Sequence, residues 1–116
     1  MARGWHILRG EGVLTLARRL PARFDVVACT VLPLADPLRL AHQVRQDVWR
    51  ALQSVRGFAP VVEVRTGPDH LVLRAGGRTC QRAAPQVAQM VQDVLEDPEN
   101  RNRWVRHAQP KQRRRP

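Results

Sequence analysis

The most regular hydrophobic pattern in the chain lies in residues 37–57, where apolar residues recur every three or four positions. This spacing places them on one face of a helix. Asp36 is a typical N-cap, Pro37 suits the first helical turn, and Gly57 suits the position after the last turn. The pattern predicts a helix of about 20 residues, with these polar residues on its outer face: Arg39, Gln43, Arg45, Gln46, Arg50 and Gln53.

Three short apolar runs predict strands. Residues 25–32, DVVACTVL, have no regular polar alternation, which is typical of a central strand covered on both faces. Residues 60–65 and 70–75 flank the turn sequence TGPD and are predicted to form a hairpin. Gly76 and Gly77 are expected to break or bulge the second strand of that hairpin.

The C-terminal third predicts two further helices. The first begins at Pro85 and carries an apolar face through residues 87–95. Asp97 and Pro98 then repeat the cap-and-proline signal, and a short helix is predicted from Pro98 to about Ala108, with its apolar stripe formed by Trp104, Val105 and Ala108. Residues 110–116 are predicted to be a disordered basic tail.

The N-terminal segment allows two interpretations. WHIL, residues 5–8, suits a short strand, and RGEG suits a turn. Residues 13–20, VLTLARRL, follow either a helix with Val13, Leu16, Ala17 and Leu20 on one face, or the second strand of a hairpin. The helix is favoured. The order (β)αβαββαα then predicts an α+β fold: a small, mainly antiparallel sheet, with a central strand plus a hairpin and helices packed on one face. Residues 1–109 form its single domain.

The net charge of the 116-residue chain is +10, and it is concentrated at the two ends. Residues 1–23 and 110–116 each carry a net charge of +4, whereas residues 24–96 carry +1. A field placed at the termini suits salt-sensitive contact with a polyanion. All basic residues except Lys111 are arginine, which together with abundant Ala, Val, Pro and Leu is typical of a GC-rich, bacterial genome. Arginine content alone is therefore weak evidence for recognition.

The strongest functional candidate is the segment RNRWVRH, in which arginines flank an indole that can stack on a base. The predicted nucleic-acid-binding residues come from this segment, from the tail and from the adjacent arginine pair near the N-terminus: Arg101, Arg103, Trp104, Arg106, Lys111, Arg113, Arg114, Arg115, Arg18 and Arg19. Two alternatives remain for Trp104, which either docks the last helix onto the domain or anchors a protein partner. On the long helix, a solvated face is favoured over phosphate binding by Arg39, Arg45 and Arg50.

Catalytic chemistry finds little support. The four histidines fall in four separate predicted elements, and no phosphate loop, nucleophile elbow or paired-cysteine motif occurs. Cys29 is expected to be a small buried hydrophobe, and Cys80 a half-buried thiol at a strand end rather than a nucleophile. No cofactor, metal site or small-molecule substrate is predicted. No run is apolar enough to span a membrane and no secretory signal pattern is present, so a cytoplasmic location without membrane contact is expected.

These observations predict a small non-enzymatic accessory protein that binds RNA or DNA non-specifically through its basic termini. The alternative is a protein-interaction or adaptor domain, able to dimerise, whose interface is Trp104 or the face of the long helix.

Overall fold

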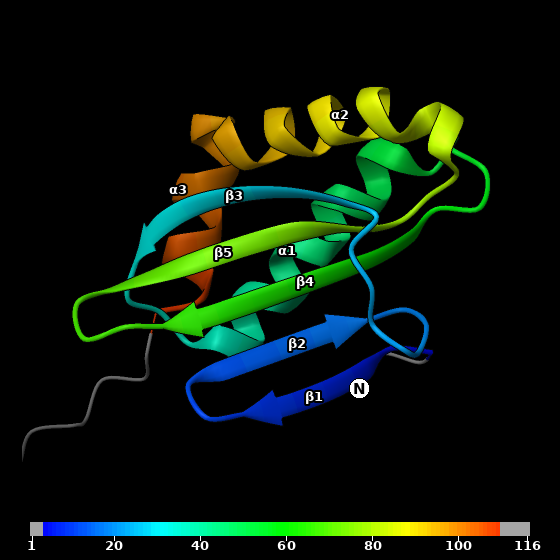
Figure 1. Cartoon of the computed structure of the whole chain (residues 1–116). Coiled ribbons are helices and arrows are strands. Elements are labelled where there is room, and N and C mark those ends of the chain that lie inside the picture. The colour runs from blue at the N-terminus through cyan, green and yellow to red at the C-terminus, as the bar shows by residue number, and fades with distance from the viewer. Residues whose placement is uncertain (1–3, 110–116) are drawn as a thin grey trace, which may run out of the picture.

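A computed structural model describes residues 4–109 as a five-stranded antiparallel sheet with helices on one face (Figure 1). The predicted α+β fold is confirmed. The strand order is β1-β2-β4-β5-β3. The elements are β1 (His6–Gly10), β2 (Val13–Ala17), β3 (Val26–Pro33), α1 (Pro37–Leu52), β4 (Ala59–Thr66), β5 (His70–Arg78), the 3-10 turn η1 (Gln81–Ala83), α2 (Ala84–Glu96) and α3 (Pro98–His107).

The predicted starts of the first and last helices are confirmed by their caps. The Asp36 carboxylate accepts hydrogen bonds from the backbone N–H groups of Leu38 at 3.0 Å and Arg39 at 3.2 Å. Asp97 does the same for Glu99 at 2.9 Å, at the corner where α2 gives way to α3. The helix α1 ends at Leu52 and spans 16 residues, so the prediction of about 20 was too long.

The favoured N-terminal helix is wrong, and the hairpin alternative is confirmed. Residues 6–17 form β1 and β2, with Gly12 in the turn at a φ of 67°. In β2, Leu14 and Leu16 are buried whereas Val13 and Thr15 are only half-buried, which is the two-residue period of a strand. Pairing of β2 with β4 fixes this choice, and that contact between distant segments is not visible in the local sequence.

The prediction that residues 25–32 form a central strand is also wrong. β3 pairs only with β5 and forms an edge of the sheet. Its even-numbered residues face the helices, whereas Val27 is 42% exposed and Val31 is 54% exposed. Cys29 lies between them and is exposed, so the expectation that it is buried fails as well.

Gly76 and Gly77 do not end or bulge β5, contrary to expectation. On the β4 side, β5 stays paired as far as Arg78, which lies opposite Ala59. On the β3 side, it stays paired as far as Gly77, which lies opposite Val26. A Cβ atom at Gly76 would collide with the backbone carbonyl of Val26. The glycines therefore allow three strands to approach closely at this end of the sheet.

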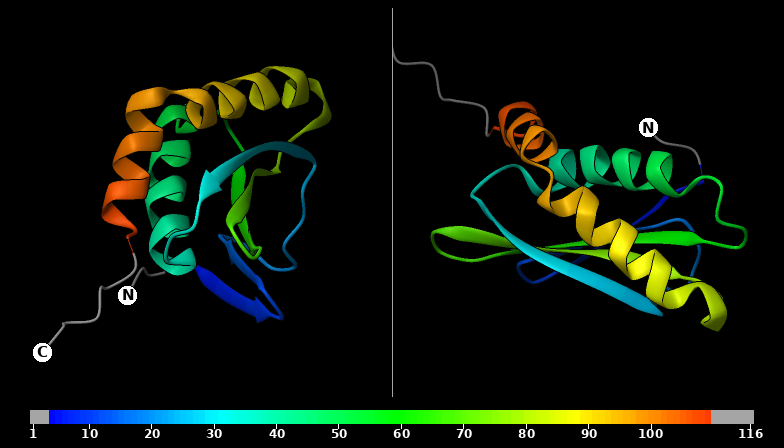
Figure 2. Two further views of the ribbon diagram at one scale, coloured as in Figure 1. Left: turned by 90° about the vertical axis from the view of Figure 1, so that its left-hand side faces the viewer. Right: turned by 90° about the horizontal axis from the view of Figure 1, so that it is seen from above.

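The hydrophobic core lies between the sheet and the helices and consists of Leu, Val and Ala side chains around Trp104. Both views in Figure 2 show α3 beside α1, with α2 leading to it across the sheet. The opposite face of the sheet is crossed at one end by the connection from β2 to β3 (Figure 1). There Arg78 donates to the carbonyl of Pro21 at 2.6 Å, and the Arg74 guanidinium lies 4.8 Å from the centre of the Phe24 ring. Among the described residues, no helix is long and apolar enough to cross a membrane.

Candidate nucleic-acid interface

Trp104 holds α3 against α1. Its side chain is fully buried, and its Nε1–H donates to Asp47 Oδ2 at 2.6 Å. Arg103 Nη1 donates to the same carboxylate oxygen at 2.9 Å, and Arg103 Nη2 donates to Asn100 at 2.7 Å. The docking alternative is confirmed. The buried indole has no free face on which a base or a partner protein could pack in this structure.

Arg101 also makes contacts within the fold. Its guanidinium donates to Thr30 Oγ1 at 2.5 Å, to the Val31 carbonyl at 2.8 Å and to the Leu95 carbonyl at 3.2 Å. These bonds connect the start of α3 to β3 and to the end of α2. The arginines at 101 and 103 are thus engaged in the packing of α3, whereas Arg106 is exposed.

The other predicted site residues are not gathered around Trp104. Arg18 and Arg19 are exposed just after β2, near the opposite edge of the sheet from β3. The remaining four, Lys111, Arg113, Arg114 and Arg115, lie outside the described residues.

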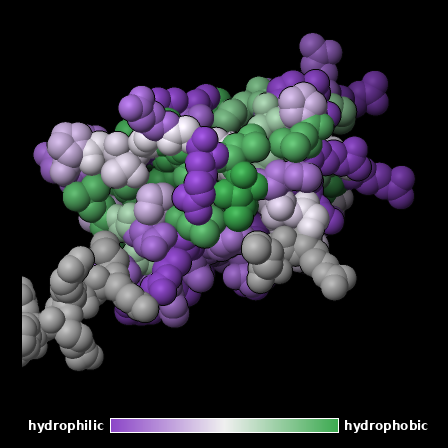
Figure 3. Space-filling view, turned by 90° about the horizontal axis from the view of Figure 1, so that it is seen from below, coloured by the Kyte–Doolittle hydropathy of each residue, from purple (hydrophilic) through white to green (hydrophobic). Residues whose placement is uncertain are grey.

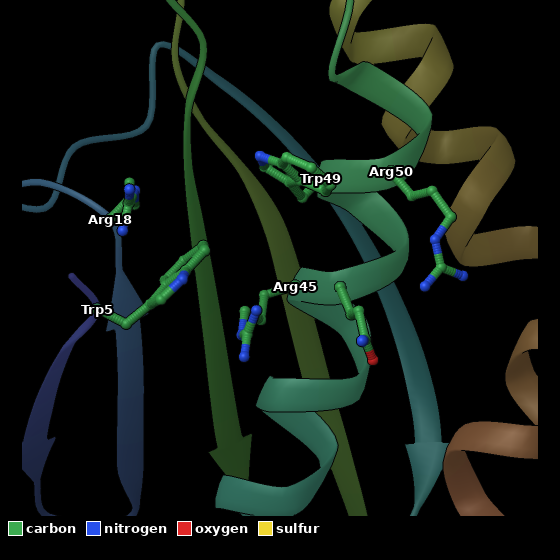
Figure 4. A pocket seen from close by; sticks show the side chains of 6 residues that line it. Trp5, Arg18, Arg45, Trp49 and Arg50 are labelled. Atoms are coloured by element: carbon green, nitrogen blue, oxygen red, sulfur yellow. The ribbon is translucent and has the colours of Figure 1, made fainter. Parts of the chain in front are cut away.

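The structure instead brings two tryptophans and three arginines together at a cavity of about 350 Å³. Trp5 precedes β1, Arg18 follows β2, and the other lining residues come from α1 (Figure 4). The hairpin register brings the first two together, because His6 pairs with Ala17. The complete lining is Trp5, Arg18, Arg45, Gln46, Trp49 and Arg50, and we call it the Trp–Arg cavity.

Two guanidinium groups approach the Trp5 ring. The Cζ atom of Arg45 lies 5.0 Å from the ring centre, and that of Arg18 lies 5.9 Å from it. Cations at these distances are attracted by the negative face of an indole. Trp49 is 51% exposed and points from α1 into the same space, whereas Arg50 extends away from Trp5 (Figure 4). The cavity thus offers one exposed indole and a second indole flanked by cations.

The electrostatics of the Trp–Arg cavity favour an anion. Among the described residues, the lining contains no carboxylate, and Arg50 forms an ion pair with Asp47 at 3.8 Å. Burial, followed by the charge of Arg18, lowers the pKa of Arg45. Burial, followed by the charge of Arg45, lowers the pKa of His42, whose Nδ1 accepts from Arg45 Nε at 3.3 Å. Burial and the neighbouring guanidinium disfavour the charged form of Arg45, and a bound phosphate would offset both effects.

Sequence reasoning missed both tryptophans of this cavity. Trp49 lies four residues after Arg45 and outside the apolar stripe of the helix, and a large aromatic residue on a polar helix face was an available signal. Trp5 was not accessible in this way, because its position depends on the hairpin. The solvated-face interpretation favoured for the helix arginines does not hold for Arg45, which is half-buried in the cavity, whereas Arg39 is exposed and outside it.

No alternative catalytic or metal centre emerges in the part of the chain that the structure describes. It contains no group of three or more His, Cys, Asp or Glu residues suited to a metal ion. Cys80 is exposed rather than half-buried as expected. At the surface, where the turn after β4 enters β5, His70 Nδ1 lies 2.8 Å from Asp69 Oδ1. Comparison of the chain with models of protein families, with curated proteins and with solved structures found no match.

Proposed function

We propose that this protein is a non-enzymatic accessory protein that binds single-stranded RNA or DNA with little sequence specificity. The observation that carries this proposal is the Trp–Arg cavity, which is lined by the exposed Trp49 indole and by the half-buried Arg45, for which no ion pair with a described carboxylate is found. Unpaired bases of any sequence have a face that can stack on Trp49, while Arg18 and Arg45 bind the adjacent phosphates.

The basic termini add a second, less specific contribution. The +4 charge of residues 1–23 and the +4 charge of residues 110–116 attract a polyanion over a longer range than the cavity does. Nucleic acid as the partner fits a cytoplasmic protein of bacterial origin, the source that the arginine-rich composition indicates. The functional centre of this proposal is the cavity at α1, and not the segment around Trp104.

The test is a titration of a labelled single-stranded RNA with the full chain and three variants. Trp49→Ala removes the exposed stacking surface, and we expect its dissociation constant to rise about 5- to 150-fold, since one stacked base contributes about 1–3 kcal/mol. Arg45→Gln should weaken binding by a comparable factor. Replacing the strand with its duplex should remove the advantage of the wild type over Trp49→Ala, because paired bases have no free face.

Arg39→Gln is the matched control. It removes the same charge from the same helix, but Arg39 is exposed and does not line the cavity. We expect less than about a twofold change from its long-range contribution alone. Equal losses for Arg39→Gln and Arg45→Gln, with no loss for Trp49→Ala, would show that the chain binds nucleic acid only as a diffuse cation. Absence of binding at low salt would exclude the function.

A further inference from the structure

The strand β3 has the properties of an unprotected sheet edge. It is eight residues long and contains no charged side chain, and Val27, Cys29 and Val31 are exposed on the face away from the helices. Edge strands normally avoid pairing with other chains through charges, short length or bulges. The opposite edge, β1, is five residues long and includes His6 and Arg9. Figure 3 views the molecule from the side of β1, where hydrophobic atoms are interrupted by hydrophilic side chains.

The hydrogen-bond pattern of the sheet shows which backbone groups of β3 point away from it. The Thr66 N–H donates to Gly12 across the β2 side of β4, and the Gly67 N–H donates to His70 across the β5 side. Backbone groups alternate in direction along a strand. The odd-numbered residues of β4 bond to β5, where they lie opposite even-numbered residues. The odd-numbered residues of β5 therefore bond to β3, and they lie opposite the even-numbered residues of β3. The N–H and C=O groups of Val27, Cys29 and Val31 therefore point away from the sheet.

These outward groups are almost unused within the described chain. The one hydrogen bond found there is from the Arg101 guanidinium to the Val31 carbonyl, which has a second lone pair. The backbone groups of residues 27 and 29 have no partner among the described residues. β3 thus presents both unpaired backbone groups and exposed apolar side chains along one edge.

We propose that β3 pairs with β3 of a second copy of this chain, antiparallel and around a twofold axis at Cys29. Each Val27 then lies opposite Val31 of the second copy, the two Cys29 residues lie opposite each other, and the two sheets form one of ten strands. A twofold axis relates identical strands in antiparallel orientation, so the interface is self-complementary. This proposal goes beyond nucleic-acid binding and uses the opposite edge of the sheet from the β1–β2 hairpin, which contributes to the Trp–Arg cavity.

The symmetry of the β3 sequence favours a second copy as the occupant, because Val27 and Val31 lie at equal distances on either side of Cys29. Two chains of net charge +10 repel each other, and they associate most readily where the contact surface has no charge of its own. β3 itself has no charged side chain, and the charged group found on its outer edge, the Arg101 guanidinium, is held by Thr30 and by the Val31 and Leu95 carbonyls. The apolar sequence of β3, typical of a strand with neighbours on both sides, is also explained when a second copy converts the edge into the centre of a larger sheet.

The first test is the molar mass of the full chain in solution, measured by sedimentation equilibrium from micromolar to near-millimolar concentration. We expect a dimer of about twice the chain mass of 13.2 kDa. Val31→Lys introduces two like charges at the interface and should give a monomer. Leu8→Lys is the matched control, since Leu8 is a 40% exposed apolar residue on the other edge strand, and it should remain dimeric. A wild-type monomer at every concentration, or dissociation by Leu8→Lys but not Val31→Lys, would overturn the proposal.

The second test locates the axis. Opposed residues of a bonded antiparallel pair have Cα atoms about 5.5 Å apart, so a short bismaleimide should join two Cys29 thiols. We expect a covalent dimer from Cys80→Ser, which retains Cys29, and none from Cys29→Ser, which retains Cys80. The reverse pattern would contradict pairing at β3. High salt should leave the dimer intact while releasing nucleic acid, so the failure of one proposal is distinguishable from the failure of the other.

Discussion

Asp47 is the residue on which the attachment of α3 most depends. Its carboxylate is 10% exposed and accepts from both Trp104 and Arg103. Asp47→Ala would leave a buried indole N–H and a half-buried guanidinium without their acceptor. Removing one partner of a buried hydrogen bond costs more free energy than the bond contributes, because the other partner stays buried without an acceptor. We expect the free energy of unfolding to fall by about 3 kcal/mol, measured by urea denaturation at neutral pH.

Asp93→Ala is the control for this prediction. Asp93 also lies on a helix and accepts a side-chain hydrogen bond, from Gln89 at 2.8 Å, but it is exposed. Its replacement should change the stability by less than about 0.5 kcal/mol. A similarly small effect of Asp47→Ala would mean that solvent or another group takes over the role of the carboxylate, and that Trp104 docks through apolar contact alone.

The same residues show how far a sequence can define a site. Trp104 was correctly placed on the apolar stripe of a short helix, and docking was among its possible roles. Its acceptor was not predictable, because Asp47 lies in the sequence between Arg45 and Arg50 and nothing local indicates that it faces α3. The role of Asp47 arises only when α3 packs on α1 and covers one side of that helix. For the same reason the arginines at 45 and 103, both on helices, have different surroundings that no local pattern reveals.

At the scale of whole elements, the end of the sheet around Gly76 gives a direct test. Gly76→Ala places a Cβ atom against the Val26 carbonyl, so β3 must move away from β5. We expect a loss of about 2–3 kcal/mol in the free energy of unfolding, as for other overpacked sites, measured by urea denaturation. Gly10→Ala is the matched strand glycine, with no atom within 4 Å of its Cβ position, and should be neutral or slightly stabilising. Equal effects of the two variants would contradict the close strand packing.

The helices were predictable and the sheet was predictable only in part, for a physical reason. Helix caps and apolar stripes are local, so Asp36, Asp97 and the stripes they precede were sufficient to place α1 and α3. Strand partners are set by contacts between distant segments. The VLTL segment became a strand because β4 lies beside it, and β3 became an edge because no further strand of the described chain reaches it. The glycines of β5 looked like breakers because their neighbours on both sides were unknown.

At the scale of the whole molecule, the four positive charges that follow the described residues lead to a last prediction. The tail from residue 110 to 116 carries four of the ten net positive charges, while the Trp–Arg cavity lies within the described domain. A chain that ends at Gln109 should therefore still bind single-stranded RNA at low salt. The logarithm of its binding constant should fall less steeply with the logarithm of salt concentration, with a slope smaller by up to about 3, because each phosphate neutralised on a single strand contributes about 0.7.

The affinity at several salt concentrations, compared between the full chain and the truncated chain, measures this difference. Combining truncation with Trp49→Ala then separates the two contributions, because a stacked base adds affinity that does not depend on salt, whereas a released counterion adds affinity that does. We expect Trp49→Ala to lower both curves without changing their slopes. If truncation instead abolishes binding and Trp49→Ala has no effect, the tail alone binds the nucleic acid, and the cavity at α1 must serve a different anion.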